Sequence, residues 1–390
     1  MALQQKGSSS MRVFFIFTLC FCWSMILRAD DRPLIDVKVN DQTVRLVFDT
    51  GSEHSYLFQQ TAKRINLNWT NPPPNTKILP GQILAGISEK CRFAIGKSTT
   101  QRQFRILNLP DYLSRDFDGV LAWVDVKNNI LSIDVNKKII FALSELPKNI
   151  DEWQKWDLLD LRQSSSTLAI KLPETSDSGG TILIDTGSPS GVELSDSLWK
   201  DCRDKHGNQR CTLSAIYYPS DGLKVYEEYW VDKLDLGQFS VKNISVRQSV
   251  ACRKFMASSY KATLGLFSLT RFDIIIDSKN NNIYVRPILK PTLKYQYNRI
   301  AAVFVPSDKT DDLVAQVVEN GPAYESGIRN GDVLAKIDDL DVTKWRTDPN
   351  VLPLSRFFER PAGNKLEMSL LRDGKPFKAI VELKEIFPQD

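Results

Sequence analysis

Hydrophobic and polar residues alternate over short stretches along most of the chain, and turn-forming residues separate those stretches. Residues 34–39 read Leu-Ile-Asp-Val-Lys-Val, Asn40-Asp41 marks a turn, and residues 44–48 form a dense apolar return segment. Alternation with a period of two is typical of a strand with one buried face, and an unbroken apolar run indicates a strand buried on both faces. The pattern therefore predicts a mainly β protein. Further strands are predicted at 93–95, 130–135, 182–184 and 273–277.

Two short segments of the chain recur in the same order. Residues 49–52 read Asp-Thr-Gly-Ser after an apolar run, and residues 185–188 repeat these four letters 136 positions later. Gly119–Ala122 and Thr263–Gly265 form a second similar pair, offset by 143 positions. Such self-similarity indicates an internal duplication. We therefore predict two pseudo-symmetric, barrel-like β-lobes, at residues 30–145 and 167–288, with a linker at 146–166.

The C-terminal part of the sequence, beyond Pro287 and Pro291, follows a different pattern. Asp373-Gly374 stands between two alternating stretches, which is typical of a type I′ β-hairpin. The pattern predicts a small α+β domain at residues 296–387. Its strands are expected at 313–318, 333–337, 366–371 and 377–383, and its helical turns at 323–326 and 353–360.

The amino terminus has the organisation of a targeting segment. Lys6 and Arg12 precede an apolar run at residues 13–27, and polar sequence resumes at Arg28. The run is shorter than the roughly 20 residues that span a bilayer and has the length of a signal-peptide core. We predict a secretory signal peptide at residues 1–29, with an uncleaved anchor as the alternative. The mature chain is then exported, periplasmic or secreted, and has no membrane span.

The charge of the protein is concentrated in that segment. Lys plus Arg number 51 and Asp plus Glu number 47, and three of the basic residues but no acidic one lie within residues 1–29. Without them, 48 basic residues face 47 acidic ones. A nearly neutral protein argues against nucleic acid as the main partner.

Four cysteines remain outside the signal segment. Cys202 and Cys211 enclose a short polar loop, so they are the first candidates for a disulfide, and Cys91 with Cys252 would be the remaining pair. An even number of cysteines in an exported protein is compatible with this arrangement. The sequence has no Cys-x-x-Cys pair or histidine cluster, so we predict no metal site.

The two Asp-Thr-Gly-Ser segments carry the candidate chemistry, although two structural turns in a duplicated β-fold are the alternative. Each segment places a carboxylate on a tight loop, where glycine allows close backbone approach. If pseudo-symmetry brings the loops together, the two carboxylates share one proton. The charged member can then activate water while the neutral member protonates a substrate carbonyl. The predicted catalytic residues are Asp49 and Asp185, and the supporting residues are Thr50, Gly51, Ser52, Thr186, Gly187 and Ser188.

Residues 44–52 and 181–188 resemble the two active-site loops of the aspartic protease superfamily, in its retropepsin-like and pepsin-like bilobal arrangement. The resemblance extends over residues 31–288 and implies peptide hydrolysis without a cofactor. It also implies that Ser52 and Ser188 support the outer carboxylate oxygens.

The sequence departs from the family pattern at one position, and two segments that the family pattern implies have no distinctive sequence here. Ala122 stands where the family usually has Gly, in the strand that packs under the catalytic loop. A hairpin that covers the substrate is expected in each copy, at residues 76–90 and 215–228, without a distinctive sequence.

Gly321-Pro322-Ala323, Ser326-Gly327-Ile328 and Gly331-Asp332 resemble the core of a bacterial-type PDZ domain. Such domains bind extended peptides or the C-termini of other proteins by adding a strand to a sheet edge. The resemblance implies an edge strand at 302–305 opposite residues 353–360, although the usual Gly-rich carboxylate-binding loop is missing. A fold used only for internal packing is the alternative. The implied peptide-binding residues are Ile300, Ala301, Ala302 and Val303.

These observations predict an exported aspartic endopeptidase that acts on peptides or proteins and carries a PDZ domain for substrate or partner recognition. Both catalytic residues lie in one chain, so the active site does not require a dimer. The competing hypothesis is a catalytically degenerate protease fold that serves as a PDZ-based binding module, and it is motivated by Ala122 and by the undistinctive sequences of the two expected flap hairpins.

Overall fold

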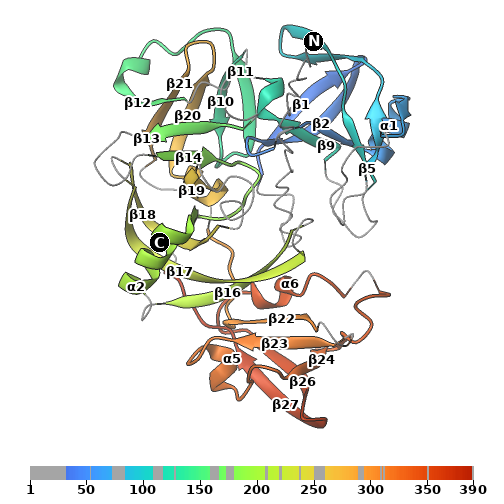
Figure 1. Cartoon of the computed structure of the whole chain (residues 1–390), viewed down its shortest axis with the longest axis vertical. Helices are drawn as coiled ribbons and strands as arrows, with labels where there is room; N and C mark the ends of the chain where they lie inside the picture. Colours follow the sequence, from blue (N-terminus) through green and yellow to red (C-terminus); the bar gives the residue numbers. More distant parts are fainter. Residues whose placement is uncertain are drawn as a thin grey trace, which may run out of the picture.

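The computed structural model describes residues 32–52, 54–72, 84–108, 117–126, 129–158, 167–172, 180–206, 210–218, 222–236, 239–249, 260–288, 294–307, 310, 312–348 and 351–388. These residues form three β-sheets, which follow one another along the long axis of the molecule (Figure 1). The predicted signal peptide lies outside the described residues. Within them, no helix combines the length and apolar character needed to cross a membrane.

The largest sheet has 14 strands and contains most of the first copy. Its apolar side chains pack into a core that continues into the second copy. The strands are β1 (Leu34–Val39), β2 (Gln42–Asp49), β3 (Tyr56–Phe58), β4 (Trp69–Thr70), β5 (Leu84–Ser88), β6 (Cys91–Ile95), β7 (Ser98–Arg102), β8 (Arg105–Leu107), β9 (Gly119–Ala122), β10 (Ile130–Asp134), β11 (Ile139–Leu143), β12 (Gln154–Asp157), β20 (Phe272–Asp277) and β21 (Asn282–Pro287). The helix α1 (Gln59–Arg64) and the 3₁₀ turns η2 (Trp123–Asp125) and η3 (Ile150–Glu152) connect them.

The first hairpin positions the first candidate loop. β1 and β2 pair antiparallel, as the alternation at 34–39 predicts, and Asn40 and Asp41 both have positive φ at the turn. β2 then pairs with β9 in parallel, so that Asp49 lies opposite Ala122. Both strands are largely buried at this end, which explains their dense apolar sequence.

The second sheet has seven strands and belongs to the second copy. β14 pairs with β19 in parallel, which repeats the pairing of β2 with β9 and places Asp185 at the end of β14. The strands are β13 (Ala169–Leu172), β14 (Gly180–Ile184), β15 (Val192–Leu194), β16 (Cys211–Tyr218), β17 (Gly222–Leu236), β18 (Phe239–Gln248) and β19 (Tyr260–Leu264), accompanied by the helices α2 (Asp196–His206) and α4 (Leu266–Leu269).

The two copies do not keep separate sheets. β10 of the first copy pairs antiparallel with β20 of the second, and β20 continues to β21. The segment expected to be a plain linker supplies β12, which pairs with β21 and buries Trp156. Residues 154–157 are therefore part of the sheet, and residues 159–166 lie outside the described part of the protein.

The third sheet forms the C-terminal part of the molecule, at the bottom of Figure 1. It has its own apolar core, and Asp373 and Gly374 have φ values of 50° and 77°, which confirms the predicted turn between its last two strands. Its elements are β22 (Ala302–Pro306), β23 (Leu313–Val317), β24 (Val333–Ile337), β25 (Leu340–Asp341), β26 (Lys365–Arg372), β27 (Lys375–Glu382), α5 (Pro322–Glu325) and α6 (Ser355–Phe358).

The predicted Cys202–Cys211 disulfide is absent, because both residues are free thiols. Cys202 lies on α2 and is buried in the core, and Cys211 begins β16 opposite Tyr229. The Cys211 thiol contacts the backbone carbonyl of Thr212. The Tyr229 ring, opposite Cys211, packs against the Trp199 ring on α2, the helix that carries Cys202. Cys91 is also a free, buried thiol, and Cys252 lies outside the described residues.

Candidate active site

The two Asp-Thr-Gly-Ser loops lie against each other. The Thr50 hydroxyl donates to the carbonyl of Ile184 at 2.6 Å, and the Thr186 hydroxyl donates to the carbonyl of Phe48, also at 2.6 Å. Each hydroxyl also accepts the other threonine's backbone N–H, at 3.0 and 3.1 Å. Both threonines are fully buried, so water does not compete for these bonds. Hydrogen bonds across the two loops are thus present in both directions.

The glycines allow each carboxyl group to lie against the opposite loop. A Cβ atom on Gly51 would lie 2.6 Å from Cγ of Asp185, and one on Gly187 would lie 2.4 Å from Cγ of Asp49. No side chain larger than hydrogen fits at these distances, which accounts for glycine in both motifs. Asp49 and Asp185 therefore face each other, within hydrogen-bonding reach.

The two carboxyl groups hold protons more tightly than ordinary aspartic acids. Burial raises the pKa of Asp49, while the Arg32 cation and the N–H groups of Gly51 and Ser52 oppose that rise. Burial raises the pKa of Asp185 well above its usual range, and the negative charge of Asp49 adds to the effect. The pKa values of both carboxyl groups are therefore raised, and the Arg32 cation opposes the rise at Asp49.

Backbone groups, not serine hydroxyls, contact the carboxylates. The N–H groups of Gly187 and Ser188 donate to Oδ1 of Asp185, at 2.9 and 3.1 Å, and the N–H of Gly51 donates to Oδ1 of Asp49 at 2.9 Å. The Ser52 hydroxyl donates instead to the backbone carbonyl of His54. The backbone N–H of Ser188 thus contacts Asp185, while the Ser188 hydroxyl donates to Glu193.

Ala122 fits the position where the family usually has glycine. It is fully buried at the end of β9, and its N–H donates to the Ser55 hydroxyl at 2.9 Å. The corresponding Gly265 has no such room, since a Cβ there would lie 2.4 Å from the carbonyl oxygen of Ser190. The extra methyl group in the first copy leaves the pairing of Asp49 with Ala122 intact.

Arg32 lies next to the carboxyl pair from outside both motifs. Leu34 pairs with Val47, and the Phe48 N–H donates to the Pro33 carbonyl, so the same register places Arg32 opposite Asp49. Its guanidinium lies over the Phe117 ring, 5.2 Å from the centroid, and its Nε is buried without a hydrogen-bond partner. Burial lowers the pKa of Arg32, while the two aspartates oppose that change.

A buried row of three charged residues lies behind Asp185. Glu193, Arg247 and Glu228 are side by side on β15, β18 and β17, and none is more than 5% exposed. Arg247 pairs with Glu193 at 2.5 Å, and the Ser188 hydroxyl donates to the same carboxylate at 3.1 Å. The row links the second loop to the C-terminal part, where the Tyr295 hydroxyl donates to Glu228.

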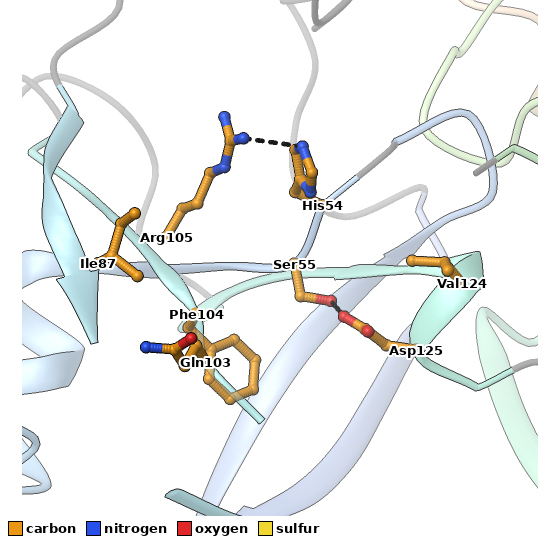
Figure 2. A pocket seen from close by; sticks show the side chains of 8 residues that line it. All are labelled: His54, Ser55, Ile87, Gln103, Phe104, Arg105, Val124 and Asp125. Atoms are coloured by element: carbon orange, nitrogen blue, oxygen red, sulfur yellow. Dashed lines mark hydrogen bonds between the residues drawn. The ribbon is translucent and has the colours of Figure 1, made fainter. Parts of the chain in front are cut away.

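A cavity of about 180 Å³ opens beside the first loop (Figure 2). His54 and Ser55 form one part of its lining, and Arg105 of β8 and Asp125 of η2 form another. An Arg105 nitrogen lies 2.8 Å from Nε2 of His54. Burial and the Arg105 charge lower the pKa of His54 to about 4, so its ring is neutral near pH 7.

The four residues expected to bind peptides in the C-terminal part are buried. Ile300, Ala301 and Ala302 are fully buried, and Val303 is 5% exposed. They lie in the turn before β22 and in its first residues, at the edge of the third sheet. Asn298 ties this turn to β16 of the second sheet, through its Nδ2 donation to the carbonyl of Leu213 at 3.0 Å.

Sequence reasoning missed the residues that surround the loops. Arg32 could have been found from the register of the first hairpin, because it lies as far before the turn as Asp49 lies after it. Arg105 and the row around Arg247 give no such signal, since strand pairing between distant segments brings them into place. His54, which the sequence leaves without a role, lines the cavity.

One comparison with known proteins gives a match, and that match lies in the first copy. A comparison with curated proteins finds no match. The family model described as aspartyl protease matches residues 35–121, which run from β1 to β9 and include Asp49. This match supports an aspartyl protease domain in that part of the protein, and with it a peptidase activity in general.

Proposed function

We propose that the protein is an exported aspartic endopeptidase whose catalytic pair is Asp49 and Asp185. The observation that carries the proposal is the reciprocal bonding of Thr50 and Thr186, because it holds two separate motifs so that their carboxyl groups face each other. If the two motifs were only structural turns, nothing would favour placing their carboxyl groups opposite each other in the interior, because burying a carboxyl group costs free energy. The match to the aspartyl protease family over residues 35–121 supports the same class of reaction.

The environments of the two aspartates give them different roles. Asp49, near the Arg32 cation, is the ionised member and takes a proton from water as general base. The water oxygen attacks the peptide carbonyl carbon, and the Asp185 proton moves to the carbonyl oxygen. The tetrahedral intermediate then collapses: the C–N bond breaks, the proton on Asp49 goes to the leaving amine, and a hydroxyl proton returns to Asp185. Atoms and charges balance, since water is the only co-reactant.

A single polypeptide supplies both halves of this pair, so the active site requires no dimer. The substrate is a peptide or protein, and the mature form, with 48 basic and 47 acidic residues, has too small an excess of positive charge to attract nucleic acid. The amino-terminal segment supports export to the periplasm or the exterior.

For the C-terminal part we propose a PDZ domain that assists substrate or partner recognition. The edge position of β22 supports this assignment, and so does the packing of Phe304 of β22 against Phe358 of α6. Strand addition uses backbone groups, so burial of the side chains at 300–303 is compatible with it. The contact of Asn298 with β16 supports the alternative, a fold used only for internal packing.

The competing binding-module hypothesis has lost one of its two motivations. The methyl group of Ala122 is accommodated without loss of strand register. The endopeptidase is therefore the better-supported function.

The test is cleavage of a peptide library at several pH values by the wild-type protein and by Asp49→Asn and Asp185→Asn. We expect each substitution to reduce kcat by at least about 10³-fold, since neither amide can exchange protons as the carboxyl groups do. A statine-type inhibitor should block the wild-type activity. Asp151→Asn, on an exposed turn, is the matched control and should retain activity. Full activity in either active-site variant would overturn the proposal.

A further inference from the structure

The cavity beside the first loop carries a positive charge that no carboxylate balances among the residues described. Asp125 is already bound by Arg102 and by the Ser55 hydroxyl. Arg105, on the opposite side, contacts the neutral ring of His54, and no carboxylate in the described part of the protein forms an ion pair with it. Figure 2 shows the two pairs apart, with Arg105 and His54 at one side and Ser55 and Asp125 at the other.

The cavity opens at the same edge of the sheet as the catalytic pair. Asp49 and Ala122 end the parallel strands β2 and β9, and Tyr56 and Arg105 begin the parallel strands β3 and β8. β9 and β3 run antiparallel, so all four positions lie at one end of adjacent strands. The sheet order β2-β9-β3-β8 puts Arg105 three strands from Asp49.

The distance between the strands that carry Asp49 and Arg105 indicates how many residues of a bound peptide separate the cleaved bond from the cavity. Three inter-strand steps of about 4.8 Å give about 14 Å between Asp49 and Arg105. An extended peptide advances about 3.4 Å per residue, so its side chain three to five positions from the cleaved bond can reach the cavity.

We propose that this cavity is a specificity subsite for an acidic side chain of the substrate, with Arg105 as its charged partner. The proposal rests on the endopeptidase function and specifies the peptides that it cleaves. The His54 ring accepts one Arg105 N–H and thereby orients the guanidinium, which leaves its other N–H groups for a carboxylate. The cavity volume of about 180 Å³ is sufficient for the side chain of Glu or Asp.

The second copy has no equivalent of this charge at the corresponding described position. Tyr56 lies seven residues after Asp49 and pairs with Arg105, whereas Val192 lies seven residues after Asp185 and pairs with the buried Val246. The cation is therefore a feature of one side of the duplicated structure, and the subsite has one fixed position relative to the cleaved bond.

The experiment uses peptides that carry a single Glu at each position within six residues of the cleaved bond, each paired with the same peptide carrying Gln. In the wild-type protein we expect kcat/KM to be about tenfold or more higher for Glu than for Gln, at one position three to five residues from the bond. Higher salt should reduce this ratio, because the interaction is electrostatic.

Arg105→Gln should bring the ratio of kcat/KM for Glu over Gln to about one, and Arg105→Lys should keep a preference for Glu. Arg105→Glu should favour a Lys peptide. Arg92→Gln, which removes an exposed arginine from β6 of the same sheet, is the matched control and should keep the wild-type ratio.

The outcomes separate the two proposals. No cleavage of any peptide would contradict the endopeptidase function itself. Cleavage without a Glu preference at any position, or a preference that survives Arg105→Gln, would overturn the subsite alone. If Arg105→Gln fails to fold, the ratios in the wild type and in Arg105→Lys still decide the matter.

Discussion

Thr50 and Thr186 hold one another's loops, because each hydroxyl donates to the other copy's strand and accepts the other threonine's N–H. The arrangement has a consequence for stability as well as for geometry. Removing one side chain breaks bonds on both sides of the pair and leaves a buried carbonyl and N–H without partners. The two loops are therefore one structural unit, although 136 residues separate them in the sequence.

The first prediction concerns this unit. Thr50→Ala and Thr186→Ala should each lower the free energy of unfolding by about 1–3 kcal/mol, the cost of unsatisfied buried polar groups. Thr50→Ser and Thr186→Ser retain the hydroxyl and should lose less. Urea denaturation measures the differences. A stability within error of wild type for both alanine variants would contradict the reciprocal bonding.

The second prediction concerns Glu193. Its negative charge raises the pKa of Asp185, so Glu193→Gln should lower that pKa. Asp185 must carry a proton to act as the acid, and the alkaline limb of the kcat/KM profile should therefore move to lower pH. The control is Glu152→Gln on the exposed turn η3, which should leave the profile unchanged. A shift of that limb to higher pH would contradict the assignment.

The third prediction concerns Arg32, which acts on the other aspartate. The Arg32 cation holds the pKa of Asp49 below the value that burial alone would give. Arg32→Gln should raise that pKa, so that Asp49 ionises at higher pH and the acidic limb of the profile moves upward. Arg32→Lys keeps a cation and should shift the limb less. An unchanged acidic limb in Arg32→Gln would show that the cation does not influence Asp49.

The fourth prediction concerns His54 and stability. The pKa of His54 is about 4 in the folded protein and 6.5 ordinarily, so between these values the unfolded protein binds a proton that the folded one does not. The His54 contribution therefore makes stability fall as pH decreases from 6.5 towards 4. His54→Gln should remove this part of the slope in urea denaturation, and His206→Gln, at the end of α2, should not. Equal slopes in all three proteins would contradict the depressed pKa.

The sequence allowed prediction of features that depend on local pattern. The hairpin of β1 and β2, the turn at Asp373-Gly374 and the two copies of Asp-Thr-Gly-Ser follow from alternation, turn residues and repetition. The sequence also allowed the prediction that Gly51 and Gly187 lie where the backbone of one loop closely approaches the other loop, because a side chain on either glycine would leave no room for that approach.

Features that depend on pairing between distant segments could not be predicted. Nothing local in β10 indicates that it pairs with β20, and nothing in Arg105 indicates that it meets His54. The Cys202–Cys211 pairing failed for a related reason: closeness in sequence says little about where two side chains pack. The Ser52 hydroxyl donates to the His54 carbonyl and the Ser188 hydroxyl donates to Glu193, and only the folded backbone reveals these partners.

The pairing of β10 with β20 joins the two copies edge to edge within a single polypeptide. Two identical subunits joined in this way would present the same groups to a peptide from both sides, and the peptide could lie across them in either direction. When both copies belong to one polypeptide, the amino-acid sequence of each copy can change independently of the other. Here the position that pairs with Arg105 in the first copy pairs with Val246 in the second, and Glu193 stands where the first copy has Leu57. Under the proposed Arg105 subsite, which only the first copy carries, the two directions of a bound peptide would no longer be equivalent.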